Sequence, residues 1–428
     1  MILNMKSYEA KDAFLGTETR FTNGVLTIHS KELQERLLQD EDQIESVDLA
    51  LAKPGNKTRI IHILDAIEPR IKEGGGASPF PGLLGPPHRV GHGVTNRLAG
   101  MAVLTCAEFP EYDPDSMMGA NEGVVDMAGP GAVLSPFGNT INLALVFKRK
   151  KQATTEGFHK AIRIAGFKTA AYLAEAVKET EPNHETQYSL ERDGGLAGLP
   201  RIAHVCLLSS LSLPLRESFI YGYPVGGMLP TALHPNEMLD GAVVGNYYIY
   251  SGVRNPTYFY QNNPILQELY KKHGKELNLV GVILSRAGDT STTGKLNQAA
   301  MAAGLAKLMQ IDGVIVSANA GGQQLVDFMF VCQQCEKRGI KAVGIVAEMA
   351  NQDGADFGFP IVLPEADALV STGNREELVD LPPMETVVGG DKILDREGWA
   401  GKPLIVPLRH VYGSGTQIGA WNIAAEAF

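Results

Sequence analysis

The stretch LVGVILSRAGDTSTTGKLNQAAMAAGLAKLMQIDGVIVSANAGG (residues 279–322) contains the pattern that decides the fold. An apolar run of strand length is followed by an alanine-rich segment with helical spacing and then by a second apolar run. Such runs recur through this part of the chain, at Leu279–Ser285, Gly313–Ser317, Lys341–Ala347 and Asp367–Thr372. Strands that alternate with helices predict right-handed crossovers and a mostly parallel sheet flanked by helices. We therefore predict an α/β protein.

The length of the chain, 428 residues, exceeds what one hydrophobic core usually supports, so we expect two domains. The first half reads as mixed α/β, with an amphipathic helix from about Thr155 to Lys178. The change between the halves falls near residue 245, between GAVVGN and LQELYKKHGK. This region is aromatic and apolar rather than linker-like, so we expect it to be packed between the halves.

Composition excludes several classes of protein. The formal net charge of -10, without a long basic run, argues against a nucleic-acid binder. No stretch approaches 18 uninterrupted apolar residues, so no membrane span is expected. The N-terminus has no secretory signal, and four cysteines are too few for a disulfide scaffold. A cytoplasmic protein is therefore expected.

Polar loops follow the predicted parallel strands, where α/β proteins bind their ligands. Asn319 lies in SANAGG, whose amides could hold a small anion or could form a plain turn. Glu348 and Asp353 lie in AEMANQDG, where they could bind an ammonium group or act as acid and base. Asp353-Gly354 is also an ordinary turn dipeptide. Asp240, in HPNEMLDG, is either a site residue or a partner of backbone donors at a turn.

Two residue pairs suggest metal or redox chemistry only superficially. His88 and His92 have an i, i+4 spacing, but prolines and glycines around them disfavour a helix and no third ligand is evident. Cys332 and Cys335 form a CxxC pair well inside a predicted helix, whereas a redox pair normally opens one. We expect solvated histidines, packed thiols and no metal.

The segment GNYYIYSGVRNPTYFY (residues 245–260) contains five of the thirteen tyrosines. Tyr247, Tyr250 and Tyr258 could hold a protonated or quaternary amine through cation–π contact. The alternative is that the alternating tyrosines form a strand at the domain interface. Both interpretations stay open from sequence alone.

Several collinear phrases resemble the proprotein of component B of the clostridial glycine, sarcosine and betaine reductases, which yields an α and a β subunit. The phrases are SVDLALAKPG (Ser46–Gly55), AIEPRIK (Ala66–Lys72), VVDMAGPGA (Val124–Ala132), PNEMLDGAVV (Pro235–Val244), NPTY with QNNPI (Asn255–Ile265), ELYKKHGKELNLVGVI (Glu268–Ile283), DGVIVS (Asp312–Ser317) and LPPME (Leu381–Glu385). The resemblance spans nearly the whole chain.

The resemblance implies an oxidoreductase component with a β-subunit-like part (residues 1–245) and an α-subunit-like part (residues 246–428). It implies a small amino or ammonium substrate, whose carbon–heteroatom bond is cleaved reductively. It also implies a cytoplasmic hetero-oligomer in which a separate subunit supplies a thiol or selenol. Asn255, which opens NPTY, joins Asn319, Asp240 and the tyrosines as a candidate substrate-binding residue.

In that family the proprotein cleaves itself at a cysteine before NPTY and leaves a pyruvoyl group. Here the interval between Asn246 and Asn255 reads YYIYSGVR, without a cysteine. Counting from the left places Ser251 at the precursor position, and counting from the right places Gly252 there. In one interpretation Ser251 forms an ester and then a pyruvoyl group, and Gly252 gives the turn its freedom. In the other, which we expect, the chain stays intact without a cofactor and binds substrate or serves as a scaffold.

Overall fold

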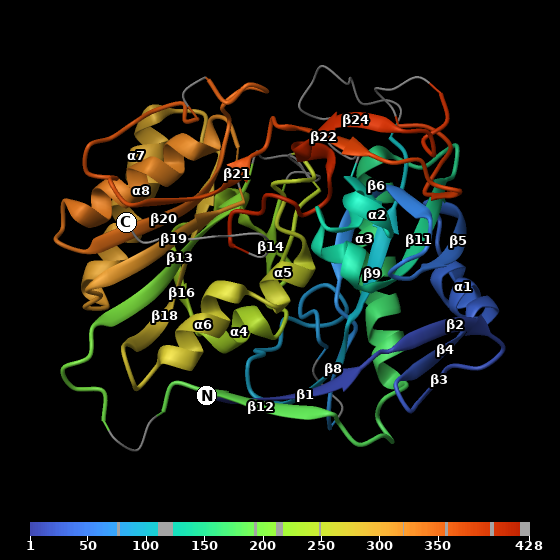
Figure 1. Ribbon diagram of the computed structural model, residues 1–428. Helices are drawn as coiled ribbons and strands as arrows, with labels where there is room; N and C mark the ends of the chain where they lie inside the picture. The colour runs from blue at the N-terminus through green and yellow to red at the C-terminus, as the bar shows by residue number, and fades with distance from the viewer. Residues whose placement is uncertain are drawn as a thin grey trace.

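The computed structural model describes residues 1–74, 78–109, 123–191, 195–210, 217–247, 250–319, 321–355, 358–393 and 398–419. Figure 1 shows two halves side by side, one rich in strands and one in which helices cover a sheet. The α/β prediction is confirmed. None of the helices within the described ranges is both long and apolar enough to cross a membrane.

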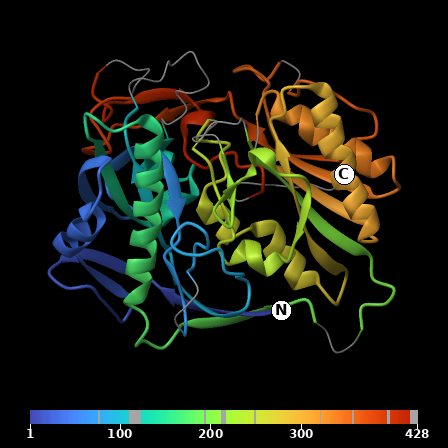
Figure 2. The same cartoon turned by 180° about the vertical axis from the view of Figure 1, so that it is seen from behind.

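The strand-rich half is built on a sheet with the strand order β10-β6-β9-β11-β5, to which β23 adds alongside β6. Its strands are β5 (Ile44–Ala52), β6 (Thr58–Ile67), β9 (Met101–Cys106), β10 (Gly123–Asp126), β11 (Ile141–Arg149) and β23 (Thr386–Val388). The long helix α3 (Thr155–Glu175) packs on this sheet and runs along this half in Figure 2. Its Thr154 hydroxyl caps the start by accepting from the Gly157 amide, 3.0 Å away. Apolar residues at helical spacing, Phe158, Ile162 and Leu173 among them, are buried.

Smaller sheets extend this half. One has the order β12-β1-β8-β7 and another the order β2-β4-β3. Their strands are β1 (Ile2–Glu9), β2 (Asp12–Gly16), β3 (Arg20–Thr22), β4 (Val25–His29), β7 (Arg70–Lys72), β8 (Gly93–Ala99) and β12 (His184–Ser189). Helix α1 (Ser30–Leu38) follows β4 directly, and α2 (Gly129–Ala132) follows β10.

The other half contains the sheet that the sequence predicts, in the order β16-β18-β13-β19-β20-β21. Its strands are β13 (Arg201–Ser209), β16 (Thr231–Leu233), β18 (Asn278–Ala287), β19 (Gly313–Ala318), β20 (Lys341–Glu348) and β21 (Leu369–Asn374). All neighbours are parallel except β16. Helices α7 (Thr292–Leu308) and α8 (Gln324–Glu336) pack together and against this sheet.

The sheet combines chain from both sides of residue 245, because β13 and β16 precede that residue and β18 onward follow it. Strand β13 lies between β18 and β19 and is hydrogen-bonded to both. The assignment of residues 1–245 and 246–428 to β-subunit-like and α-subunit-like parts stays a prediction. The two stretches are nevertheless interleaved in one sheet.

Short elements connect the halves. They are β14 (Phe219–Ile220), β15 (Tyr223–Pro224), β17 (Val243–Val244), α4 (Pro235–Leu239), α5 (Thr257–Gln261) and α6 (Pro264–Lys272). The tyrosine-rich segment is not an interface strand in its described part, since β17 ends at Val244 and helix α5 begins only at Thr257. Residues 251–257 are all buried, and they contact Asp65 of the strand-rich half and Asn319 beyond β19, so the prediction that this region packs between the halves is confirmed for these residues.

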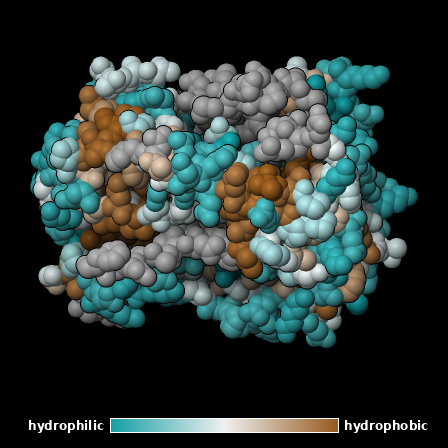
Figure 3. Space-filling view, turned by 45° about the horizontal axis from the view of Figure 1, so that its top comes forward, coloured by the Kyte–Doolittle hydropathy of each residue, from teal (hydrophilic) through white to brown (hydrophobic). Residues whose placement is uncertain are grey.

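A buried ion pair fastens the last part of the chain to the strand-rich half. The Arg59 guanidinium donates to both oxygens of Asp126, at 2.6 and 2.9 Å. It also donates to the carbonyl oxygens of Pro382, Ala400 and Lys402, at 2.7 to 2.9 Å. Strands β22 (Leu378–Leu381) and β24 (Leu404–Pro407) lie next to these anchor points in the sequence. On the face seen in Figure 3, apolar residues gather in patches between hydrophilic ones.

We expect Asp126→Ala to destabilise the fold by about 3–5 kcal/mol, because it leaves the Arg59 charge buried without its carboxylate. Urea unfolding measures this change. The control is Lys57→Ala, which removes an exposed ion pair with Glu385 close by in the sequence and should change the midpoint little. Equal effects of the two substitutions would contradict a special role for the buried pair.

Candidate functional site

The candidate site lies where the buried segment 250–255 meets the carboxyl ends of parallel strands. The Asn255 amide nitrogen donates to Oδ1 of Asn319, just beyond β19, at 3.1 Å. The Asn255 side chain donates to the Ala318 carbonyl at 3.0 Å. Val253 and Tyr250 pack against Ala347 of β20. The structure therefore brings together residues that the sequence predicts separately, in the place where ligands bind to α/β sheets.

Ser251 and Gly252 form the centre of a tight turn. The amide of Val253 donates to the Tyr250 carbonyl oxygen at 3.1 Å, which closes the turn. Space around Gly252 is fully used: a Cβ there would lie 2.7 Å from the Arg409 Cα atom and from the Leu408 carbonyl oxygen. Only glycine fits without a shift of the neighbouring chain.

That neighbouring stretch of chain, residues 408–415, forms a strap across the turn. Three backbone hydrogen bonds join the strap to the turn. The Gly252 amide donates to the Arg409 carbonyl at 2.7 Å, the Gly413 amide to the Ser251 carbonyl at 3.1 Å, and the Gly415 amide to the Gly252 carbonyl at 2.8 Å. The strap therefore fixes the turn like an added strand.

The Ser251 side chain is buried, with 2% of the residue exposed. Its hydroxyl lies 3.2 Å from each of the carbonyl oxygens of Arg409 and His410 and donates to them. Both acceptors are neutral backbone groups and neither is a base. This arrangement holds the serine in place without activating it as a nucleophile.

Two guanidinium groups contact the ring of Tyr250. The Arg375 and Arg409 Cζ atoms lie 5.2 and 4.8 Å from the ring centroid. Both arginines also pair with Glu376. Burial, together with the charge of Arg375, lowers the pKa of Arg409 below its ordinary value. The ring that could hold a substrate cation therefore already contacts two cations of the protein.

Tyr247 belongs to a second buried cluster. The Arg163 guanidinium lies 4.2 Å from its ring centroid and donates to the Gly245 carbonyl oxygen at 2.6 Å. The His159 ring is 5.5 Å away. Burial raises the pKa of Tyr247, and burial with nearby arginine charges lowers the pKa of His159. Tyr247 is thus a buried, neutral phenol.

Asp65 of β6 anchors the segment from the strand-rich half. Its carboxylate accepts from the Thr257 amide at 2.9 Å and from the Thr257 hydroxyl at 2.7 Å. Burial raises the pKa of Asp65, and the hydrogen bonds from Thr257 oppose that shift. The Thr257 hydroxyl oxygen in turn accepts from the Gly245 amide at 3.1 Å. The two ends of the turn region are held together through this one carboxylate.

The remaining predicted residues lie in other surroundings. Glu348 ends β20, and its carbonyl oxygen accepts from the Arg375 amide at 3.2 Å, so it lies at the edge of the site. Asp353 is exposed and accepts from the Ala355 amide at 3.1 Å, as a turn residue does. Tyr258 lies edge-on to Phe137.

Asp240 is 2% exposed and accepts from Lys72, Thr95 and the Gly91 amide at 2.6 to 2.7 Å. Both of its oxygens are thus used within the fold. Ligand roles for these residues stay predictions.

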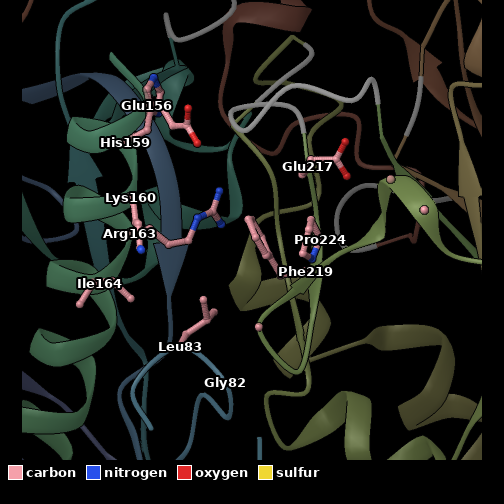
Figure 4. A pocket seen from close by; sticks show the side chains of 13 residues that line it. Gly82, Leu83, Glu156, His159, Lys160, Arg163, Ile164, Glu217, Phe219 and Pro224 are labelled. Carbon is pink, nitrogen blue, oxygen red and sulfur yellow. The ribbon is translucent and has the colours of Figure 1, made fainter. Parts of the chain in front are cut away.

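A cleft of about 780 Å³ opens between α3 and the β14–β15 hairpin (Figure 4). Its polar lining comes from Glu156, His159, Lys160, Arg163 and Glu217, and apolar contact comes from Leu83, Ile164 and Phe219. Glu217 is 4% exposed and accepts from the Ser210 hydroxyl at 2.8 Å, just beyond β13.

Sequence reasoning missed this cleft. Its charged residues come from two separate parts of the chain, α3 and Glu217, and carry no motif. The one available signal was Arg163, a charge among the apolar residues of the predicted helix.

The backbone at one side of the cleft depends on two glycines. A Cβ on Gly82 would lie 1.9 Å from the Tyr221 carbonyl oxygen, and one on Gly222 would lie 2.3 Å from the Gly82 carbonyl oxygen. Both have positive φ angles, +78° each. The two loops can therefore touch only because neither residue has a side chain.

The thiols are packing groups in the structure. Cys332 and Cys335 are buried within α8, and burial raises the pKa of Cys335 to about 12. A group of three or more His, Cys, Asp or Glu side chains suited to a metal ion is not found among the described residues.

Comparison with known proteins identifies the family. Residues 1–420 match the model for glycine/sarcosine/betaine reductase component B subunits. The chain belongs to this family.

Component B relatives cover nearly the whole chain. "Glycine reductase complex component B subunits alpha and beta" of Acetoanaerobium sticklandii is 34% identical over 91% of this chain and 89% of that protein. "Sarcosine reductase complex component B subunit alpha" of Peptoclostridium acidaminophilum has the same identity and coverage. "Betaine reductase complex component B subunit alpha" of that organism is 34% identical over 95% and 92%. No solved structure matches the chain. The chain is thus an oxidoreductase component of the component B type.

We expect Gly252→Ala to destabilise the protein by about 1–3 kcal/mol, because the added Cβ overpacks the strap. Thermal unfolding, with hydrogen exchange at residues 408–415, measures the change. The matched control is Gly304→Ala in α7, where a Cβ meets nothing within 4 Å and better helix propensity should stabilise slightly. A neutral Gly252→Ala would show that the strap does not hold the turn tightly.

Proposed function

We propose that this chain is the substrate-binding subunit of a hetero-oligomeric reductase complex. It binds a small amino or ammonium compound, and a partner subunit bearing a thiol or selenol cleaves the carbon–heteroatom bond reductively. The family match over residues 1–420 supports the class of complex. The cleft beside the 245–255 segment is the observation that carries the binding role.

The lining of the cleft suits a small zwitterion. Glu217 and Glu156 can pair with an ammonium group, and Arg163 and Lys160 can pair with a carboxylate. Phe219 adds an aromatic face, although the Arg163 Cζ atom already lies 4.8 Å from its centroid. At about 780 Å³ the cleft has the volume of pockets for much larger, drug-sized ligands, about 300–1,000 Å³. A small substrate would leave room for a reactive side chain of the partner.

The proposed division of labour gives this chain binding and orientation. The partner's thiolate or selenolate attacks the substrate carbon next to nitrogen, and a carbon–sulfur or carbon–selenium bond forms. The carbon–nitrogen bond breaks, and the amine leaves with the electron pair. Fixing the substrate for attack along the line opposite the leaving nitrogen lowers the barrier through orientation.

We also propose that the chain is not cleaved between Tyr250 and Ser251. A pyruvoyl group supplies an electrophilic carbonyl where a family member forms one, but the residues here do not fit its formation. The Ser251 hydroxyl donates to the backbone carbonyl oxygens of Arg409 and His410, and Gly252 is enclosed by the strap. The proposed chemistry therefore does not use such a group.

A second candidate function is a scaffold subunit that shapes the active site of the partner. It is favoured by the arginines on Tyr247 and Tyr250, because these rings already contact protein cations. In this function the cleft receives a side chain of the partner rather than a free substrate.

The purified protein is expected to give one species near 46.0 kDa under denaturing conditions, because the partners of the Ser251 hydroxyl in the described part of the chain are backbone carbonyl oxygens. Intact mass spectrometry measures this, and Ser251→Ala should leave the pattern unchanged. Two fragments separated at residues 250/251, abolished by Ser251→Ala, would overturn the uncleaved chain and establish self-processing.

We expect Glu217→Gln to weaken binding of glycine, sarcosine or betaine roughly tenfold to a hundredfold, since a hydrogen bond to a charged group contributes about 1.5–3 kcal/mol. Isothermal titration calorimetry measures the affinity. Glu185→Gln on the exposed strand β12 is the matched control and should bind normally. Wild-type protein that binds none of the three compounds, yet is required for turnover in a reconstituted complex, would favour the scaffold function.

A further inference from the structure

Arg163 is a buried positive charge in the wall of the cleft. It lies on α3, and Figure 4 shows its side chain extending from the helix toward Phe219 of the facing hairpin. Only 5% of the residue is exposed. One guanidinium nitrogen donates to the Gly245 carbonyl oxygen at 2.6 Å. Among the described residues, no carboxylate oxygen lies within the 4.0 Å of an ion pair with this guanidinium.

The groups that contact the Arg163 guanidinium are neutral. Its Cζ atom lies 4.2 Å from the ring centroid of Tyr247 and 4.8 Å from that of Phe219. Cation–π contacts and one carbonyl oxygen replace only part of the hydration that a charge loses on burial. A guanidinium has five N–H donors in a planar fork, which matches both oxygens of a carboxylate. A carboxylate in the cleft therefore supplies the counter-charge that the described part of the fold does not.

Neighbouring charges also favour an anion at this wall. Thr257 donates to both oxygens of Asp65, so this buried carboxylate is directed at the 245–257 segment rather than at Arg163. Burial lowers the pKa of His159, which lines the cleft, and the positive charges of Arg163 and two other arginines lower it further. The same charges that disfavour a proton on His159 favour a negative group beside it.

The facing wall is less open to an ammonium group. The Ser210 hydroxyl donates to Oε1 of Glu217 at 2.8 Å. A Cβ on Gly226 would lie 3.1 and 3.3 Å from the two Glu217 oxygens, so the backbone is close to both of them. The aromatic face of Phe219 is already next to the Arg163 guanidinium. A ligand nitrogen therefore adds to the affinity without being the group that the cleft requires.

We infer that Arg163 is the anchor of the cleft, and that the cleft takes small carboxylates whether or not they carry a nitrogen. The inference rests on the proposed binding function and names the chemical group that the cleft recognises first. Acetate is then the minimal ligand. An amino group on the same carbon adds its contact with Glu217 on the opposite wall.

The same arrangement excludes small amines that have no carboxylate. Such a cation meets the Arg163 charge without neutralising it, and like charges repel across a site of low dielectric. Acetate and methylammonium have the same methyl group and nearly the same size, so they differ mainly in the sign of their charge. The pair therefore separates recognition of the carboxylate from recognition of the ammonium group.

Saturation-transfer NMR on the full chain tests this with wild-type protein, because both compounds carry a methyl signal. At one ionic strength, acetate should receive saturation from the protein and be displaced by glycine, and methylammonium should receive none. In Glu217→Gln the affinity for glycine should fall toward that for acetate, and the affinity for acetate should not fall.

Substitution of the anchor gives a second measurement. Arg163→Gln should weaken acetate and glycine by the same factor, at least about tenfold, because charge-assisted hydrogen bonds to the carboxylate are lost. Arg163→Lys keeps the charge without the fork and should fall between Arg163→Gln and wild type. The matched control is Lys168→Gln, which removes one exposed positive charge from the same helix outside the cleft and should change neither affinity by more than about twofold.

Two outcomes would overturn the inference and leave glycine binding, and with it the proposed function, in place. They are methylammonium that receives saturation as strongly as acetate, and glycine affinity that is equal in wild type and folded Arg163→Gln. Wild-type protein that binds neither acetate nor glycine would overturn the inference and the binding function together. Should Arg163→Gln not fold, the wild-type comparison of acetate with methylammonium still decides the question.

Discussion

The structure depends on hydrogen-bond partners for a buried stretch of backbone that is neither helix nor strand. Residues 251–256, which precede α5, are buried between two sheets, where water cannot supply hydrogen bonds and each unpaired amide or carbonyl is costly. Partners come from both sides: Asp65 from the strand-rich half, Asn319 from the parallel sheet, and the strap across the turn. The two halves are joined because each completes the hydrogen bonding of the same segment.

The sequence predicts best those elements that short-range residue patterns determine. The alternation of strands and helices after residue 279 follows from short-range spacing, and it is found with shifts of only a few residues. The place of β13 in that sheet has no local signal, because its partners follow it by dozens of residues. The cleft is not predicted from sequence for the same reason, since only the tertiary fold places Glu217 and Arg163 around one cleft. The sequence predicts Asn255 and Asn319 as separate site residues, but it carries no signal for the contact between them.

Charge is distributed unevenly around the site. The whole chain carries a formal charge of -10, yet Arg375 and Arg409 share one carboxylate, Glu376, beside Tyr250. Arg163 lies between Phe219 and Tyr247 at the cleft. Tyrosine rings stabilise these guanidinium groups where water is scarce.

Because the sheet is interleaved, the folded structure does not depend on an unbroken peptide bond at the turn. Strand β13 lies between β18 and β19, so a nick at residues 250/251 would separate no folded body from another. The two pieces would stay together through ladder hydrogen bonds and shared core, as a reassembled protein does. Selection can therefore gain or lose a break at this turn while the architecture is preserved. A family can thus change its chemistry at one residue without rebuilding its fold.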